Sequence, residues 1–408
     1  MSSNQRPTQA VILAGGLGTR LRPLTNSIPK PMIPFHGKPF LEYLIKMVRD
    51  QGVTDILLLL GYLPDPVVKH FGNGSTLGVQ IEYSITPVED ETGQRIRNAR
   101  DLIHEQFILM YCDNYWPMRW DDMWNRYEQS GLDSQMTVYT NEDGFTRNNL
   151  RVGSKLEIEV YDKSRSDPNL SGVDIGFMIL QKSALQFLPA GNVSFEATAL
   201  KRLVDDGKVG AYETAHRYYS IGSLERLDET KRFLARKPAI LLDRDGTLNK
   251  RMPPAKYVTS WDDWEWLPGS LEALADLRRA GFSVYLITNQ PGIGKGVISE
   301  ADLESIHDHM KRDVIAEGGR IDGVYYCPHD WDEGCSCRKP EPGLLFQAQR
   351  ENALDLTRTY FIGDDERDGM AAEAAGCPYV ILASDQPLNT VVSDVIADSH
   401  TDISGNIE

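Results

Sequence analysis

The chain has 408 residues, enough for two domains of ordinary size that each bury a core. Acidic residues (59) outnumber basic ones (43), and the net charge of -16 argues against nucleic acid as a partner. No apolar run approaches the roughly 20 residues of a membrane span, and the first residues do not form a signal peptide. We therefore expect a cytoplasmic protein with no membrane partner. The composition is compatible with a homo-oligomer.

The N-terminal region opens with a predicted strand and a glycine-rich turn. Residues 10–14 are apolar and typical of a buried first strand. The turn that follows contains Gly15, Gly16, Gly18, Thr19 and Arg20. Glycines let backbone amides approach a polyphosphate closely, and Arg20 can offset its charge. Such a turn is weak evidence alone, but it continues into Leu-Arg-Pro-Leu-Thr and then Pro29-Lys30-Pro31, which makes the signal much stronger.

On these motifs, residues 8–236 resemble the sugar-1-phosphate nucleotidyltransferases. The resemblance implies a doubly wound, Rossmann-like domain of the glycosyltransferase-A type, in which the turn and its arginine bind a triphosphate and Lys30 approaches the α-phosphate. It also implies that Asp113 binds magnesium, that Lys163 contacts the sugar phosphate and that Glu196 contacts sugar hydroxyls. The sugar phosphate would attack the α-phosphorus in line and release pyrophosphate.

Two departures from this family concern the metal and the nucleotide base. The family commonly has Asp-Ile-Gly-Thr where this chain has Ser220-Ile-Gly-Ser, so a second carboxylate for magnesium is absent, and a hydroxyl is a poorer ligand for a hard cation. In this family a glycine-rich run usually lets the chain pack against the nucleotide base, and residues 89–99 lack that run. Arg95 and Arg97 would crowd the position of the base. Two alternatives follow, an active transferase or a degenerate domain kept for binding or assembly.

A charged helix is predicted over residues 227–237, and Pro238 ends it. We therefore place the domain boundary near residue 237, with a nucleotidyltransferase domain at 1–236 and a phosphatase domain, argued next, at 237–408. Both are expected to be doubly wound α/β domains.

Four short motifs in the second domain come in an order that suits hydrolysis of a phosphate ester. They are Asp243-Arg-Asp245-Gly-Thr, Thr288-Asn289, Lys339 and Gly-Asp364-Asp365. Apolar runs precede three of them and are typical of buried parallel strands, whose carboxyl ends bind ligands in open α/β sheets. An isolated Asp-x-Asp pair is usually a solvated turn. The complete set favours catalysis, because it can supply a nucleophile, an acid, a cation and metal ligands.

On these motifs, residues 238–395 resemble the haloacid-dehalogenase (HAD) phosphatase superfamily, with its Rossmannoid fold. The resemblance implies that Asp243 attacks phosphorus to form an aspartyl-phosphate. It implies that Asp245 protonates the leaving group and later activates water. Residues implied to hold the phosphoryl oxygens and the substrate are Thr288, Asn289, Arg338 and Lys339. Residues implied to bind magnesium are Asp243, Asp245 and Asp364.

A loop rich in cysteine precedes Lys339. Its candidate metal ligands are Cys327, His329, Cys335 and Cys337. Thiolates and imidazole at this spacing suit a closed tetrahedral zinc site with no position for a substrate water, so the zinc would be structural. A disulfide pair or scattered buried thiols are the alternatives. Cys112 and Cys377 lie alone in the sequence and are interpreted as buried apolar thiols.

Two apolar features of this domain are interpreted as core. Leu303, Ile306, Met310 and Val314 form an inward stripe on an acidic helix. The cluster Trp261, Trp264 and Trp266 is interpreted as packing rather than as a sugar-stacking surface.

The zinc loop and the run at 288–294 resemble the heptose-bisphosphate and histidinol-phosphate branch of the superfamily, although Asp365 stands where related sequences often have lysine. Together the resemblances imply a bifunctional enzyme of heptose activation. It would remove the 7-phosphate of D-glycero-D-manno-heptose 1,7-bisphosphate and transfer a nucleotidyl group from an NTP, with GTP favoured, to the heptose 1-phosphate. A histidinol-phosphate phosphatase, or a phosphatase with a non-catalytic nucleotidyltransferase domain, are the alternatives.

Overall fold

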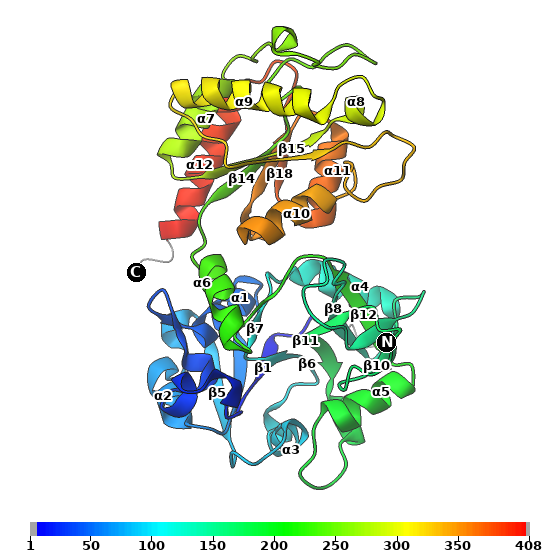
Figure 1. Ribbon diagram of the computed structural model, residues 1–408. Helices are drawn as coiled ribbons and strands as arrows, with labels where there is room; N and C mark the ends of the chain where they lie inside the picture. The colour runs from blue at the N-terminus through cyan, green and yellow to red at the C-terminus, as the bar shows by residue number, and fades with distance from the viewer. Residues whose placement is uncertain (1–5, 405–408) are drawn as a thin grey trace. The chain divides into compact units, whose positions relative to one another are not determined.

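A computed structural model describes residues 6–404 of the protein. The chain divides into two compact units, one ending at Leu234 and the other beginning at Ala235 (Figure 1). Both units are α/β, as the sequence predicts. The charged helix predicted over residues 227–237 is α6 (Leu227–Leu234), which ends three residues earlier than expected. The outermost residues of the two expected domains, 1–5 and 405–408, lie outside the described residues.

A seven-stranded sheet forms the centre of the N-terminal unit. Its strands are β1 (Gln9–Ala14), β4 (Asp55–Leu60), β5 (Gln80–Ile85), β6 (Gln106–Tyr111), β8 (Ser134–Tyr139), β11 (Val173–Gln181) and β12 (Val209–Thr214). They lie in the order β12-β8-β11-β6-β1-β4-β5, and β11 alone runs antiparallel to its neighbours β6 and β8. The carboxyl ends of β1, β4 and β6 therefore share one edge, where the glycine-rich turn begins.

Helices and short strands complete this unit. The helices are α1 (Phe40–Asp50), α2 (Pro64–Phe71), α3 (Thr92–Asn98), α4 (Trp120–Ser130), α5 (Lys201–Asp205) and α6. The short strands pair as β2 (Pro34–Phe35) with β3 (Lys38–Pro39), β7 (Asn114–Tyr115) with β13 (Tyr219–Ser220), and β9 (Leu150–Val152) with β10 (Ile158–Tyr161). One face of the main sheet packs through Leu57, Phe107 and Met178 against Ile96 of α3 and Leu203 of α5.

The C-terminal unit is built on five parallel strands. They are β14 (Ala239–Leu242), β15 (Ser283–Asn289), β16 (Gly323–Cys327), β17 (Tyr360–Gly363) and β18 (Tyr379–Ile381). Their order is β16-β15-β14-β17-β18, so the first strand in sequence lies at the centre. All five carboxyl ends meet at one edge of the sheet, and the order of the strands reverses beside β14, which is where open α/β sheets bind ligands.

The described part of this unit also contains six helices. They are α7 (Ser270–Arg279), α8 (Pro291–Gly294), α9 (Glu300–Ala316), α10 (Gly343–Asn352), α11 (Glu366–Ala375) and α12 (Leu388–Ser404). Residues of α7, α9 and α12 pack on one face of the sheet, and Figure 1 shows α10 and α11 on the opposite face.

The predicted core of the C-terminal unit is confirmed. The apolar stripe of α9 is at most 2% exposed. Trp261, Trp264 and Trp266 pack against the core, and the ring of Trp261 stacks on Trp264 and on His309. These tryptophans are packing residues, as predicted. Among residues 6–404, no helix is both long enough and apolar enough to cross a membrane.

Candidate active sites

The carboxyl edge of the C-terminal sheet gathers the predicted phosphatase residues. Asp243 follows β14 directly, Thr288 and Asn289 end β15, and Asp364 follows β17. A cavity of about 300 Å³ opens at this edge. The predicted residues that line it are Asp243, Asp245, Thr288, Asn289, Arg338 and Lys339. The structure therefore brings together groups that lie almost 100 residues apart in the chain.

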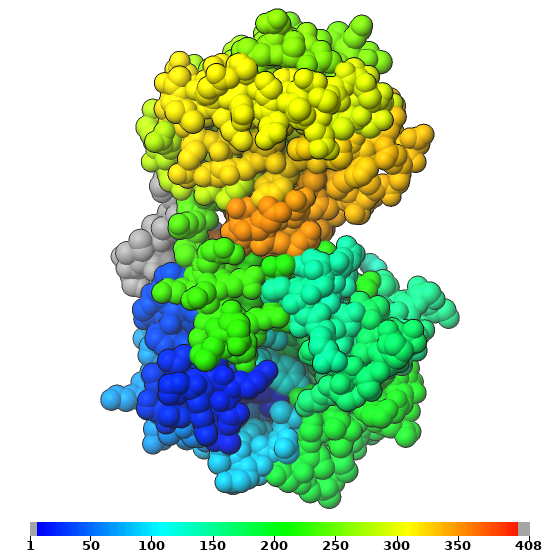
Figure 2. Space-filling model, viewed as in Figure 1, coloured from blue at the N-terminus to red at the C-terminus, as the bar shows by residue number. Residues whose placement is uncertain are grey.

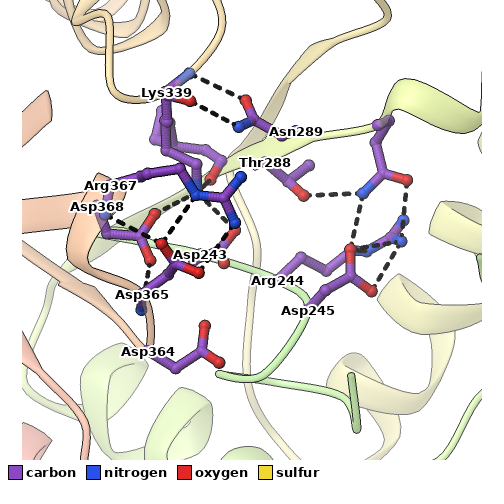
Figure 3. Close-up of polar contacts among 12 residues, drawn as sticks. Asp243, Arg244, Asp245, Thr288, Asn289, Lys339, Asp364, Asp365, Arg367 and Asp368 are labelled. Carbon is purple, nitrogen blue, oxygen red and sulfur yellow. Dashed lines mark hydrogen bonds and ion pairs between the residues drawn. The ribbon is translucent and has the colours of Figure 1, made fainter. Parts of the chain in front are cut away.

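A buried ion cluster lies at the base of the cavity (Figure 3). The ammonium of Lys339 contacts Asp243 Oδ1 at 2.8 Å and Asp368 Oδ1 at 2.6 Å, and donates to the carbonyl of Ile287 at 2.8 Å. Burial disfavours the charged form of Lys339, but the two carboxylates outweigh it and raise its pKa. Burial, reinforced by Asp368, raises the pKa of Asp243 to about 7 against the opposing charge of Lys339.

Three carboxylates of this edge fit a divalent cation. Oxygens of Asp243, Asp364 and Asp368 lie within 4.8 Å of one another, and carboxylate oxygens are the preferred ligands of magnesium. Burial raises the pKa of Asp364 to about 6, with Asp368 adding to the effect. Gly246 has a φ of 101°, and a side chain there would collide with the Asp364 carboxylate. The site therefore requires glycine at that position.

This group differs from the predicted set of metal ligands. Asp368, which the sequence analysis missed, belongs to it, and the side chain of Asp245 does not. Asp368 lies in the first turn of α11, four residues after Asp364, and that spacing on a helix start was the available signal.

Asp245 is held apart from the ion cluster by a second network. Arg244 contacts both of its carboxylate oxygens at 2.9–3.1 Å, and the side-chain amides of Asn249 and Gln290 donate to it at 2.9 and 2.8 Å. In Figure 3 its carboxylate lies beside Arg244, whereas that of Asp243 lies near Asp368. Burial alone would raise the pKa of Asp245, but Arg244 and the amide donors outweigh burial and lower it.

Arg244 is itself fixed in place. It is 1% exposed and donates to Nε2 of His307, whose pKa is lowered to about 3, chiefly by burial and then by Arg244. His307 is therefore a neutral acceptor, which suits a guanidinium neighbour.

Thr288 and Asn289 differ in how they face the cavity. The hydroxyl of Thr288 is buried and accepts from the Gln290 amide at 2.8 Å. Both ends of the Asn289 amide bind the backbone of Lys339, each at 3.0 Å. Asn289 therefore positions Lys339 in this structure.

The mouth of the cavity is rich in cations that the sequence analysis mostly missed. The cationic residues that line it are Arg251, Lys256, Arg338 and Arg367. Asp365, the departure from the related sequences, is paired with Arg251 at 3.2 Å and with both Nε and Nη2 of Arg367 at 2.8–2.9 Å. Trp331 also lines the mouth and is 69% exposed.

The cysteine loop brings its four predicted ligands together. One ligand atom from each of Cys327, His329, Cys335 and Cys337 lies within 4.8 Å of the others. The sulfur atoms of Cys335 and of its two cysteine neighbours are 3.5–3.6 Å apart, so they form no disulfide. Three thiols and an imidazole converging in this way fit a structural zinc ion. Cys112 and Cys377 are buried and form no disulfide, as predicted.

In the N-terminal unit, a second cavity of about 410 Å³ lies at the end of β1 and β6, and Figure 2 shows a hollow beside the dark blue segment. The predicted residues that line it are Gly15, Gly16, Gly18, Thr19, Arg20, Lys30 and Asp113. Lys30 and Asp113 form an ion pair at 2.6 Å. The groups predicted to meet a triphosphate and its metal thus share one cavity.

The predicted sugar residues adjoin this cavity through hydrogen bonds. Glu196 is buried and accepts from Thr92 at 2.8 Å and from Tyr111, and both of these line the cavity. Lys163 lies 3.7 Å from Glu196. Asp174 accepts from Tyr161, and burial raises its pKa to about 6.

Ser220 lies beside Asp113. The strand pair β7–β13 joins Ser220 to Asn114, and the amide of Ile221 donates to the Asp113 carbonyl at 2.9 Å. The Ser220 hydroxyl accepts from the amide of Gly222 at 3.0 Å. The chain therefore carries a hydroxyl, and no carboxylate, at this position next to Asp113 in the strand pair.

The two arginines of segment 89–99 have different surroundings, and only Arg95 is among the residues that line the cavity. Arg97 bonds to the carbonyls of Pro189 and Gly191 and does not line the cavity. Arg95 is 4% exposed, and its guanidinium lies directly against Gly15 and Gly61. It donates to Thr86 Oγ1 and to several carbonyls, among them those of Leu60, Pro87 and Val88. Arg95 therefore fastens together segments of the cavity wall.

Family models match both units. The Nucleotidyl transferase model matches residues 9–146, and the HAD-hydrolase-like model matches residues 336–399. A D-glycero-beta-D-manno-heptose-1,7-bisphosphate 7-phosphatase of Bordetella bronchiseptica is 43% identical over 143 residues, which are 35% of this chain and 79% of that protein. The chain belongs to this 7-phosphatase family. A 7-phosphatase of Pseudomonas aeruginosa is 38% identical over 152 residues, which are 37% of this chain and 84% of that protein.

Solved structures resemble each unit. The D,D-heptose 1,7-bisphosphate phosphatase of B. bronchiseptica, complexed with magnesium and phosphate, is 36% identical, with a TM-score of 0.37 over 40% of this chain and 99% of that one. HddC from Yersinia pseudotuberculosis, complexed with GMP-PN, is 27% identical, with a TM-score of 0.48 over 55% and 99% of the two chains. The chain thus joins an N-terminal nucleotidyl transferase domain to a 7-phosphatase-like HAD domain.

The raised pKa values of Asp243 and Asp364, about 7 and about 6, predict how cation binding depends on pH. Both carboxyls are ionised above pH 7 and become neutral as the pH falls through these values, so protons displace the cation at low pH. We expect the affinity for Mn²⁺ to be more than about tenfold weaker at pH 5.5 than at pH 8. Titration of Mn²⁺ followed by electron paramagnetic resonance measures it, and an unchanged affinity would contradict the raised values.

Proposed function

We propose that the chain is a bifunctional enzyme of nucleotide-activated heptose synthesis. Its C-terminal unit removes the 7-phosphate of D-glycero-D-manno-heptose 1,7-bisphosphate, and its N-terminal unit transfers a nucleotidyl group to the heptose 1-phosphate. The observation that carries the proposal is the close relation to 7-phosphatases in a chain that also matches a nucleotidyl transferase model. The product of the first reaction is the acceptor of the second, which gives the fusion a chemical reason.

Hydrolysis proceeds in two displacements. An oxygen of Asp243 attacks phosphorus, the bond from phosphorus to the sugar oxygen breaks, and the Asp245 carboxyl gives its proton to the leaving oxygen. Asp245 then takes a proton from water, which attacks the aspartyl-phosphate and restores Asp243 with release of phosphate. Lys339 and the Thr288 hydroxyl bind the phosphoryl oxygens. Magnesium at Asp243 and Asp364, when bound, offsets the charge of the phosphoryl group.

Asp245 must change partners to carry out the first of these steps. In the structure Arg244 and two amide donors hold it ionised, which suits a base that accepts a proton from water. Donation needs the protonated acid. We infer that Asp245 turns away from Arg244 when substrate enters.

The mouth of the cavity favours a bisphosphate over histidinol phosphate. Besides Arg244 and Lys339, which are held by carboxylates, four cations line the cavity, and Asp365 pairs with two of them. We propose that these four lie at the mouth, whereas the ion cluster at the base serves the phosphate that reacts. A second phosphate would be attracted to such a mouth. Histidinol phosphate carries an ammonium group at its far end, which the same cations would repel.

The N-terminal cavity supports an active transferase over a degenerate domain. Arg20, Lys30 and Asp113 line one cavity with the glycine-rich turn, and these groups can offset the charge that in-line attack gathers on a triphosphate. Arg95 lines the cavity, and its hydrogen bonds join segments of the cavity wall. We propose magnesium on Asp113 as the cofactor and GTP as the favoured nucleotide. Structural zinc in the cysteine loop, and a cytoplasmic location, complete the proposal.

Two substitutions should separate the reactions. Asp243→Asn removes the nucleophile and should lower phosphate release by at least about 10³-fold while pyrophosphate release from GTP and heptose 1-phosphate continues. Lys30→Ala should do the reverse, with a loss of roughly 10²–10³-fold in pyrophosphate release. The activity that each variant keeps shows that the protein is still folded. Substantial phosphate release by Asp243→Asn would rule out the aspartyl-phosphate.

The hydroxyl of Ser220 predicts a specific metal requirement for the transferase. If it lies at the second ligand position of the transferase, Ser220→Asp should lower the magnesium concentration for half-maximal pyrophosphate release by roughly tenfold. Ser223→Asp, three residues away, is the control. If neither the wild type nor Ser220→Asp binds an NTP or forms pyrophosphate at saturating magnesium, the N-terminal unit is a binding or assembly domain.

The zinc loop should be needed for folding. Metal analysis should find about one tightly held zinc per chain, and Cys335→Ser should lower the thermal stability of the C-terminal unit, because binding free energy at such sites is folding free energy. Cys377→Ala, a buried thiol of the same unit outside the loop, is the control. A stable, fully active protein without zinc would contradict the structural role.

A further inference from the structure

Arg251 joins two parts of the phosphatase site. Its Nη2 contacts Asp364 Oδ1 at 2.8 Å, its Nη1 contacts Asp365 at 3.2 Å, and its Nε donates to the carbonyl of Asp245 at 3.4 Å. The side chain is 45% exposed, so it is not locked by packing. Neither the sequence motifs nor the ion cluster at the base of the cavity had pointed to it.

Arg251 and a divalent cation compete for one carboxylate. Asp364 belongs to the three carboxylates that fit a cation, and a cation at its oxygen would repel a guanidinium 2.8 Å from the same carboxylate. Binding of the cation therefore weakens the contact between Arg251 and Asp364. The contact between Arg251 and Asp365 remains and keeps the arginine near the site.

The position of Arg251 gives the displaced guanidinium a second partner. Arg251 begins the segment 251–258, every residue of which lines the cavity. Arg338 and Lys256 line the same mouth, so an anion there would meet several cations. A guanidinium binds phosphate through two parallel hydrogen bonds and is well suited to this exchange.

We propose that Arg251 exchanges Asp364 for the distal phosphate of the substrate when a divalent cation binds, and so links cation binding to recognition of a bisphosphate. This inference rests on the proposed phosphatase function. Arg251 acts as a specificity-determining residue: it opposes the cation when the mouth holds no anion, and it favours the substrate once the cation is bound. Because one side chain both opposes the cation and favours the substrate, a substitution of Arg251 must remove both effects together.

The test is a single variant that should change two properties in opposite directions. Arg251→Gln should bind Mn²⁺ about two- to fivefold more tightly in the absence of substrate, because an exposed competing ion pair is removed. The same variant should raise KM for heptose 1,7-bisphosphate by about tenfold. Its KM for p-nitrophenyl phosphate, which lacks a distal phosphate, should stay unchanged. A site that is merely damaged would lose Mn²⁺ and both substrates together.

Arg367→Gln is the matched control. Arg367 is similarly exposed and pairs with Asp365, but among the contacts of the described residues it does not touch Asp364. It removes the same charge, so equal tightening of Mn²⁺ in both variants would overturn the exchange, as would unchanged or weaker Mn²⁺ binding in Arg251→Gln. An equal loss of both substrates would also overturn it. If the wild type shows no preference for the bisphosphate over p-nitrophenyl phosphate, the proposed function fails instead.

Discussion

The buried ammonium of Lys339 is the interaction on which the phosphatase site depends. It holds Asp243 and Asp368 within 2.8 Å of one nitrogen, and without it two buried carboxylates would face each other unpaired, at a cost of several kcal/mol. The fold supplies the supporting contacts. The carbonyl of Ile287 accepts from the ammonium, and the Asn289 amide fixes the Lys339 backbone. The proposed nucleophile, the proposed phosphoryl-binding cation and the candidate metal ligands therefore share one cluster of contacts.

The parallel sheet explains why so much of this site could be predicted. Asp243, Thr288 and Asp364 each end or follow an apolar strand, and parallel strands must bring their carboxyl ends to one edge. The cysteine spacing likewise predicted a cluster that forms within one loop. In these cases the chemistry is local to a short motif, and the sheet topology supplies the rest.

What the sequence did not reveal depends on contacts between distant segments. Arg251 meets Asp364 and Asp365 across more than 100 positions, and nothing in the local pattern marks an arginine in an irregular segment. Asp368 is inconspicuous as one acid in a helix start. Arg95 was expected to crowd the position of the nucleotide base. It lines the cavity, and its guanidinium donates to the carbonyls of Gly15, Leu60, Pro87 and Val88. A buried guanidinium with such partners is a wall element, and only the tertiary structure identifies those partners.

The two cavities would handle phosphate with different groups under the proposed function. Carboxylates and a buried lysine line the cavity of the C-terminal unit, and a glycine-rich turn with Arg20 and Lys30 lines that of the N-terminal unit. The most direct measurement is an assay of the wild-type protein in which phosphate and pyrophosphate are followed separately, with heptose 1,7-bisphosphate and a panel of NTPs. We expect phosphate release without any NTP, and pyrophosphate release when GTP is added. A preference for histidinol phosphate, or the absence of pyrophosphate with every NTP, would contradict this expectation.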